Sequence, residues 1–206
     1  MMVCPRLKRY GVRVNELPDN VITTKGCLIT VVGPSGSGKD TIMRAGMEVF
    51  SDDPDVYWVR RVITRDSEPG REDHDSVSVE QFKKMSERGE FAVQWHAHGL
   101  SYGVPVSIHQ HILDGKVVIA NGSRAALDDF RQQFKNFKAV WINASEEVLV
   151  ERLVDRGTES VEAIRERLQR RPSVTPDEDD VVIDNNGQVD ESVEQLINLI
   201  LGLKPG

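Results

Sequence analysis

Residues 27–41 constrain the fold of this chain more than any other stretch, because an apolar run leads there directly into a glycine-rich turn. Residues 27–32 are mostly apolar or β-branched, and a helical pattern begins after the turn. Such a run is typical of a strand that is buried on both faces of a parallel sheet. The turn, Gly33-Pro-Ser-Gly-Ser-Gly-Lys39, matches the phosphate-binding pattern G-x-x-x-x-G-K, whose glycines let backbone N–H groups surround an anion. The stretch therefore predicts a nucleotide phosphate site at the end of a buried strand.

The residues of this turn have separate expected roles. Lys39 should reach the β- and γ-phosphates of a nucleotide. The pattern usually continues with Ser or Thr, which offers a hydroxyl to Mg²⁺, whereas this chain has Asp40 followed by Thr41. Mg²⁺ prefers oxygen ligands, so we expect Asp40 and Thr41 at the metal, directly or through water. The expected nucleotide-binding residues are Gly33, Pro34, Ser35, Gly36, Ser37, Gly38, Lys39, Asp40 and Thr41. A glycine-rich linker is the alternative, and the flanking strand and helix patterns argue against it.

Composition limits the classes of protein to which this chain can belong. At 206 residues it is long enough for one sizeable core with a small insert. Its formal net charge of −7 argues against a broad nucleic-acid-binding face. No apolar run reaches the roughly 18 residues that a membrane span needs. The two cysteines, Cys4 and Cys27, make no disulfide framework, so we expect a cytoplasmic protein with Cys27 in its core.

Strand and helix patterns alternate along the chain, which predicts an α/β domain with a mostly parallel sheet over residues 26–206. Residues 1–25 hold no regular period and are expected to be a flexible extension. We expect a strand over residues 57–63 that brings Arg60, Arg61 and Arg65 to an anion site, and a solvated strand edge is the alternative. Residues 64–105 look like a small inserted substrate domain.

Polar residues follow the apolar strand expected over residues 116–120. Because ligands meet the carboxyl ends of parallel strands, Asn121, Ser123 and Arg124 should face the same crevice as the phosphate loop. His96 and His98 invite a metal interpretation, but no third ligand stands in phase with them. We therefore expect these two histidines to line a substrate cleft.

Arginines gather between residues 152 and 171, which is unusual in an acidic chain. Arg152 and Arg156 lie four residues apart and share a helical face, and Arg167 lies on the next helix. We expect residues 152–171 to form a lid whose arginines reach the phosphates of ATP. The alternative is an exposed helix with interleaved glutamates.

From residue 28 onward the chain resembles the guanylate kinase family of nucleoside monophosphate kinases. The resemblance covers about 180 residues and rests on Gly33-Pro-Ser-Gly-Ser-Gly-Lys39, Thr64-Arg65, Val77-Ser-Val-Glu-Gln-Phe82, Tyr102-Gly103 and Arg156-Gly157. The chain is more similar to the branch called ribose 1,5-bisphosphate phosphokinase. That similarity rests on Gly38-Lys-Asp40, Arg61-x-x-Thr-Arg65, His96-Ala-His-Gly-Leu100 and Asn121-Gly-Ser-Arg124. The resemblance implies a three-layer P-loop fold with an inserted substrate domain and a lid.

The chain departs from guanylate kinases where that family binds the base. Val93 stands in place of the glutamate that reads guanine, and Val104 in place of a guanine-contacting hydroxyl. Valine cannot pair with the donor edge of a purine, and burying such a group unpaired costs roughly 1–3 kcal/mol. Asn121 and Ser123 stand where the family carries two aspartates. The sequence therefore predicts an acceptor that has phosphate groups and no base.

The phosphate side of the acceptor site is better preserved. By the resemblance, Arg65 is a phosphate-binding arginine, Arg61 replaces a serine that touches the same phosphate, and Tyr102 is retained. His74 stands in place of a phosphate-contacting tyrosine, and Asn185 lies near the adenine of ATP. The expected substrate residues are Arg61, Arg65, His74, Tyr102, Asn121 and Ser123, and the expected catalytic residues are Lys39, Arg152, Arg156 and Arg167.

The resemblance implies a kinase that uses ATP and Mg²⁺ to convert ribose 1,5-bisphosphate into 5-phospho-α-D-ribose 1-diphosphate, in phosphonate breakdown. The partner is then a small sugar phosphate, and the sequence leaves open whether the chain forms a homodimer. Two alternatives remain at this point. One is a guanylate kinase with a rebuilt base pocket, and the other is an inactive guanylate-kinase-like binding module. The intact Lys39 and its loop argue against the second.

Overall fold

The computed structural model describes residues 26–65, 73–155, 161–169 and 174–205. The expected N-terminal extension, residues 1–25, lies outside the described residues, as do residues 156–160, which include Arg156, and residues 170–171 of the expected lid. In the described parts of the chain, no helix has the length and apolar character needed to cross a bilayer.

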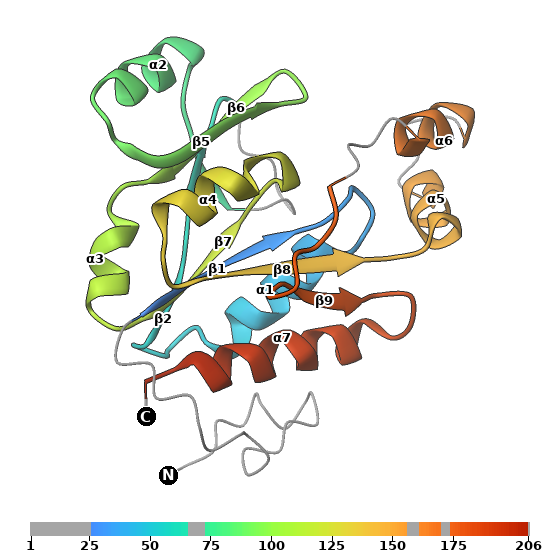
Figure 1. The fold of residues 1–206 in the computed structure, drawn as a ribbon. Coiled ribbons are helices and arrows are strands. Elements are labelled where there is room, and N and C mark those ends of the chain that lie inside the picture. The colour runs from blue at the N-terminus through green and yellow to red at the C-terminus, as the bar shows by residue number, and fades with distance from the viewer. Residues whose placement is uncertain (1–25, 66–72, 156–160, 170–173, 206) are drawn as a thin grey trace.

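A five-stranded parallel sheet forms the centre of the molecule (Figure 1). Its strand order is β2-β7-β1-β8-β9, and every neighbouring pair is parallel. The strands are β1 (Cys27–Val32), β2 (Val56–Trp58), β7 (Val117–Asn121), β8 (Phe137–Asn143) and β9 (Val181–Asp184). Every residue of β1 is buried, which confirms the strand expected from its continuous apolar run.

Helices cover both faces of this sheet, so the fold has three layers (Figure 1). Apolar side chains of α1 (Lys39–Val49) and α7 (Val189–Leu203) pack with one face of β1. Those of α3 (Ile108–Leu113) and α4 (Leu127–Gln133) pack with the other face. Adjacent residues of β1 point to opposite faces of the sheet: Ile29 packs with α1 and α7, and Leu28 packs with α3 and α4. The predicted α/β fold class is confirmed.

A second, four-stranded sheet stands beside the main sheet and has the order β4-β3-β6-β5. Its strands are β3 (Arg61–Ile63), β4 (His74–Ser76), β5 (Phe91–Ala97) and β6 (Leu100–Pro105). The helix α2 (Val79–Glu87) covers its outer side (Figure 1), where Phe82 stacks on Phe91. The capping box at Ser78 and Gln81 is present, as its sequence pattern predicts.

The single strand expected over residues 57–63 is wrong, because the chain passes there from one sheet to the other. Val59 still donates its backbone N–H to Ile119 of the main sheet, at 2.8 Å. From Arg61 onward the backbone pairs with β4 and β6 instead. The strand β6 was not anticipated either. An alternating pattern shows that a segment is extended but not which strand will be its partner.

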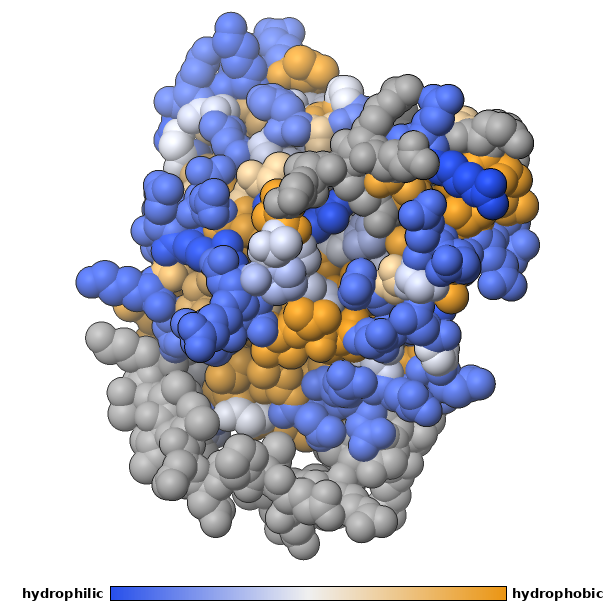
Figure 2. Space-filling view, turned by 45° about the vertical axis from the view of Figure 1, so that its right-hand side comes forward, coloured by the Kyte–Doolittle hydropathy of each residue, from blue (hydrophilic) through white to orange (hydrophobic). Residues whose placement is uncertain are grey.

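The remaining helices lie at the ends of strands. A short 3-10 helix, η3 (Arg124–Ala126), leads from β7 into α4. The helix α5 (Glu146–Asp155) follows β8, and α6 (Val161–Gln169) packs against it. Figure 2 shows that hydrophilic residues cover most of one face of the molecule, with apolar residues gathered near its centre.

Candidate active site

The phosphate loop joins β1 to α1, as the sequence predicts. Gly36 and Gly38 both have a φ of +86°, a conformation that favours glycine. A Cβ at Gly33 would lie 2.5 Å from the Ile142 carbonyl oxygen, so only glycine fits there. Gly38 precedes the first turn of α1 and offers it no side-chain cap, so that turn presents N–H groups to an anion.

Asn185 holds this loop from behind. Its side chain is buried, and its Nδ2 donates to the Ser37 carbonyl at 2.7 Å. Ser192 of α7 donates its hydroxyl to Asn185 Oδ1 at 3.1 Å, which fixes the orientation of the amide. The structure therefore places Asn185, expected near the adenine, against the backbone of the phosphate loop.

Arg152 reaches the same loop from α5. Its Nη2 donates to the Asn185 carbonyl at 2.9 Å. Its Nη1 is buried without a hydrogen-bond partner among the described residues, and a Cβ added to Gly38 would lie 3.8 Å from it. A buried guanidinium nitrogen without a partner is costly, so this position fits an anion bound in the loop.

Lys39, Asp40 and Asn121 meet beside the loop. Lys39 Nζ donates to Asn121 Oδ1 at 2.7 Å and to Asp40 Oδ1 at 2.9 Å. Asn121 Nδ2 lies 3.4 Å from Asp40 Oδ1. Asn121 thus contacts the loop and does not appear among the residues that line the cleft.

A cleft of about 380 Å³ opens in front of the phosphate loop. Residues 33–41 of the loop and of α1, except Ser37, form one wall. The opposite wall comes from two elements, the β5–β6 hairpin and the segment that follows β7. It is formed by Trp95, Ala97, His98, Tyr102, Gly122, Ser123 and Arg124. The crevice expected at the carboxyl ends of β1 and β7 is therefore present.

Two aromatic side chains line the cleft on the side of the β5–β6 hairpin. Trp95 and Tyr102 pair across β5 and β6, and their rings are parallel with centroids 5.4 Å apart. The guanidinium carbon of Arg61 lies 5.5 Å from the Trp95 ring centroid and 5.1 Å from that of Tyr102. Arg61 is buried, so the structure places it against the aromatic pair.

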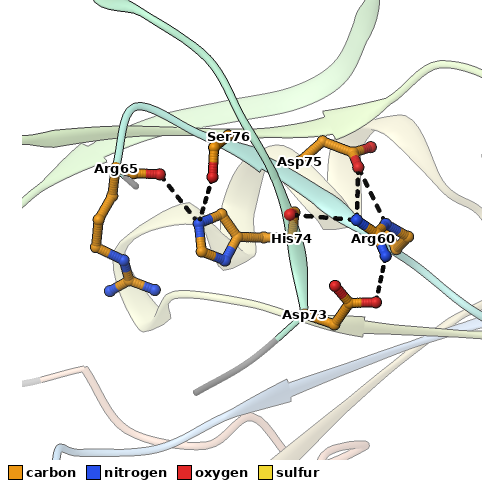
Figure 3. Close-up of polar contacts among 6 residues, drawn as sticks. All are labelled: Arg60, Arg65, Asp73, His74, Asp75 and Ser76. Carbon is orange, nitrogen blue, oxygen red and sulfur yellow. Dashed lines mark hydrogen bonds and ion pairs between the residues drawn. The ribbon is translucent and has the colours of Figure 1, made fainter. Parts of the chain in front are cut away.

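Arg65 follows β3, and His74 holds its backbone (Figure 3). The Nε2 of His74 lies 3.1 Å from the Arg65 carbonyl oxygen, to which it donates in the tautomer protonated at Nε2. His74 is buried, so it positions Arg65. The Nε of Arg65 is buried without a hydrogen-bond partner among the described residues. Arg60, by contrast, is bound by Asp73 and Asp75 on the far side of His74 (Figure 3).

Ser123 and Arg124 have different roles in the cleft wall. Ser123 Oγ accepts from the Ala125 N–H at 3.3 Å and so caps η3. A Cβ at Gly122 would lie 2.2 Å from Thr30 Cγ2, so this backbone is packed closely against β1. Arg124 is half-buried, and burial lowers the pKa of its guanidinium. Among the described residues, none forms a hydrogen bond or ion pair with the Arg124 guanidinium, while the Arg124 carbonyl accepts from the Leu127 N–H.

The sequence expectations did not include Trp95 among the site residues, and they left Arg124 outside the expected substrate set. Only the pairing of β5 with β6 shows that Trp95 faces the cleft. His98, expected as cleft lining, has a φ of +52° at the turn between β5 and β6. Such left-handed positions are uncommon for residues other than glycine, and they often accompany functional sites.

Two expected catalytic residues cannot be placed. Arg156 lies outside the described residues, and Arg167 lies on α6 with a side chain that is also outside them. For a metal, the described residues contain no cluster of three or more His, Cys, Asp or Glu. Asp40 and Thr41 both line the cleft and supply oxygen atoms, which fits Mg²⁺ if nucleotide phosphates complete its coordination.

The chain is similar to known proteins over most of its length. The guanylate kinase family model matches residues 25–202. "Ribose 1,5-bisphosphate phosphokinase PhnN" of Rhizobium etli is 45% identical over 180 residues, covering 87% of this chain and 91% of the relative. The protein of the same name from Brucella melitensis is 46% identical over 177 residues, covering 85% and 92%.

The fold is also that of a solved structure. The crystal structure of guanylate kinase from Anaplasma phagocytophilum superposes with a TM-score of 0.66 at 18% identity, covering 87% of both chains. At that identity the likeness concerns the fold alone. The sequence similarity carries the assignment, and it confirms the resemblance inferred from the motifs. The chain belongs to the guanylate kinase family, and within that family it groups with the ribose 1,5-bisphosphate phosphokinases.

Proposed function

We propose that the protein transfers the γ-phosphoryl group of ATP to the 1-phosphate of ribose 1,5-bisphosphate, yielding ADP and 5-phospho-α-D-ribose 1-diphosphate. One observation carries this proposal. Among the described residues, the cleft wall opposite the phosphate loop has no carboxylate or amide side chain, while it does carry Arg124. Guanine would need acceptors for its N–H groups, and a sugar phosphate needs cations and hydroxyls. The names of the similar proteins support the same acceptor.

The two valines that replace the base-reading residues support this choice of acceptor. Val93 and Val104 are buried in the apolar cluster that includes Ile108 and Phe130. Neither lines the cleft. A base placed there would leave its donor groups unpaired, at roughly 1–3 kcal/mol for each group.

The chemistry needs positioning and charge neutralisation more than proton transfer. The attacking atom is an oxygen of a phosphate that is ionised at neutral pH, so no general base is required. The loop N–H groups and Lys39 hold the β- and γ-phosphates of ATP. Arg124 and Arg65 would hold the phosphates of the acceptor. The Trp95–Tyr102 pair supplies an apolar surface for the ribose ring.

Asp40 and Thr41 would hold Mg²⁺ beside the loop. When bound, this ion would supply positive charge that neutralises the transferring phosphoryl group. The arginines of the proposed lid, Arg152, Arg156 and Arg167, would add positive charge at the transferring group. We expect Arg156→Ala to reduce turnover far more than ATP affinity, because a lid arginine acts on the charge that develops during transfer. Equal losses in kcat and in ATP affinity would contradict that role.

The cytosol is the compartment that we propose for this reaction. Cys27 is a free thiol in the core, as expected from the sequence. Burial raises the pKa of this thiol to about 11, so it stays protonated and unreactive at neutral pH. A buried free thiol is compatible with a reducing environment.

An assay of ADP release tests the proposed function. The purified protein is given Mg-ATP with either ribose 1,5-bisphosphate or GMP, and the sugar product is identified by mass spectrometry. We expect turnover with the sugar bisphosphate and none above background with GMP. Turnover with GMP alone would establish a guanylate kinase, and inactivity with both acceptors would indicate a binding module.

A further inference from the structure

The contact between the phosphate loop and the end of β7 has an unusual distribution of charge. Val31 of β1 pairs with Asn121 of β7, so Asn121 ends the strand beside the one that carries the loop. Its side chain reaches back to Lys39 and Asp40 across the sheet edge. Three side chains from two elements therefore form one contact beside the nucleotide site.

In P-loop nucleotide-binding proteins, two groups commonly hold Mg²⁺. One is the Ser or Thr hydroxyl that follows the loop lysine, and the other is an aspartate at the end of a separate strand. Here the residue after the lysine is Asp40, and the neighbouring strand ends in Asn121. Compared with the usual arrangement, the carboxylate therefore lies on α1 instead of at the end of the neighbouring strand. The neutral polar side chain lies at the end of that strand instead of on α1.

We propose that Asp40 and Asn121 form an exchanged pair, in which Asp40 supplies the carboxylate of the metal–nucleotide site and Asn121 is its neutral positioning partner. This inference rests on the ATP and Mg²⁺ part of the proposed function and does not depend on the acceptor. It also gives Asn121 a role on the nucleotide side of the site, in place of the substrate role expected from the sequence.

The hydrogen bonds explain why residue 121 should be neutral. Lys39 can only donate, so Asn121 must turn Oδ1 toward it, which leaves Nδ2 for Asp40. An aspartate at this position could only accept, and its oxygen would lie about 3.4 Å from that of Asp40. Two carboxylates at this distance repel each other, and together they would hold Lys39 away from the nucleotide phosphates.

Exposure supports the division of roles. The Lys39 side chain is 15% exposed, whereas that of Asp40 is 59% exposed and lines the cleft. The carboxylate is therefore accessible to an ion that arrives with the nucleotide. Asn121 is buried, as expected for a residue that orients others.

A four-protein cycle tests this pair: the unmodified chain, Asp40→Thr, Asn121→Asp, and the double variant, which restores the usual arrangement. Isothermal titration calorimetry measures ATP affinity with Mg²⁺ and with EDTA, without any acceptor. Mg²⁺ raises the ATP affinity of the unmodified chain by some factor, and we expect that factor to be at least 10-fold smaller in Asp40→Thr. We expect Asn121→Asp to weaken ATP binding at least 10-fold, and the double variant to return within about 5-fold of the unmodified chain.

The inference is overturned if the loss of ATP affinity in the double variant is as large as the product of the losses in the two single variants. It is also overturned if Mg²⁺ raises the ATP affinity of Asp40→Thr as much as it raises that of the unmodified chain. Asp40→Asn is a second variant of nearly equal size, and it should lose the same gain while melting at an unchanged temperature. Because no acceptor is present, a chain that fails to phosphorylate ribose 1,5-bisphosphate can still pass this test. Failure of the cycle in an active kinase would refute the exchanged pair alone.

Discussion

Arg124 shows at the scale of a single residue how the cleft is prepared for an anion. Its guanidinium is half-buried, and burial lowers its pKa, which means that the charged form is desolvated. It lines the cleft and, among the described residues, has no counter-charge. A phosphate would supply the missing partner. Arg60 is a natural contrast, since Asp73 and Asp75 already neutralise it at the surface.

We predict that Arg124→Ala lowers kcat/KM for ribose 1,5-bisphosphate by about 10- to 150-fold, as expected for the loss of roughly 1.5–3 kcal/mol in a charge-assisted hydrogen bond. The KM for ATP should change little. Steady-state kinetics with each substrate varied in turn measures both values. Arg60→Ala is the matched control, because it removes the same charge from an already neutralised position. An equal loss in both variants would mean that only net charge matters.

At the scale of elements, the phosphate loop depends on the strand–helix connection and on the residue behind it. Gly38 and Gly89 both have positive φ values, of 86° and 69°. A Cβ at Gly38 would lie 2.3 Å from Asn185 Nδ2, whereas one at Gly89 would meet nothing within 4 Å. Substitution of either glycine causes backbone strain, but only substitution of Gly38 also causes a steric clash. Comparing the two variants therefore distinguishes the effect of the clash from the effect of the strain.

We predict that Gly38→Ala abolishes measurable ATP binding, because the added Cβ displaces Asn185 and with it the loop. Gly89→Ala should cost only the strain of a left-handed alanine, roughly 1–2 kcal/mol of unfolding free energy, with kinetics unchanged. Calorimetric ATP titration and thermal melting measure the two effects. ATP binding by Gly38→Ala at normal affinity would show that the loop adapts.

We also predict that Asn185→Ala weakens ATP and GTP binding by the same factor. The amide bonds the Ser37 carbonyl, so its loss leaves a buried acceptor unpaired and loosens the loop for any nucleotide. The expected cost is about 1–3 kcal/mol, or a melting temperature roughly 2–10 °C lower. Competition binding with both nucleotides measures the ratio. A loss confined to ATP would point instead to a direct contact with adenine.

At the scale of the whole molecule, one buried carboxylate ties the returning chain to the main sheet. Asp180 accepts hydrogen bonds from Arg131 of α4 at 2.6 Å and from Trp141 of β8 at 2.8 Å. It also accepts from the Asp177 backbone at 3.0 Å. Its side chain is 5% exposed. These bonds fix the segment that leads into β9, and β9 in turn leads to Asn185 behind the phosphate loop.

We predict that Asp180→Ala lowers the unfolding free energy by about 3 kcal/mol, because it removes the buried acceptor of Trp141 and the buried carboxylate partner of Arg131, which keeps only the exposed Asp128 and Asp177. In a chain of this length, the melting temperature should fall by roughly 6–12 °C. Differential scanning calorimetry measures the change. Glu90→Ala is the control, since its partner Arg88 is exposed and such pairs contribute about 1 kcal/mol or less. Equal shifts would show that burial of Asp180 is unimportant.

Local chemistry made much of the site predictable. The apolar strand, the glycines of the loop and the capping box at Ser78 each depend on neighbours within a few residues, and the structure contains all three. The strand over residues 57–63 was wrong because its two halves join different sheets. Asn185 and His74 were expected at ligands, and in the structure Asn185 bonds a backbone carbonyl 148 residues away, while His74 contacts one nine residues away. Such partners leave no periodic signal.

Hydrophobic periodicity and glycine conformation act locally, so the buried strand and the phosphate loop at the centre of this fold could be predicted from the residues of one short stretch. The strand ends that meet at the cleft could not be predicted in this way, since strand pairing depends on contacts between residues far apart in the chain. That pairing places Asn121 between Lys39 and Asp40, 81 residues along the chain from Asp40. It also turns Trp95 and Arg124 toward the same cleft. The arrangement of charge at the site is therefore a property of the fold.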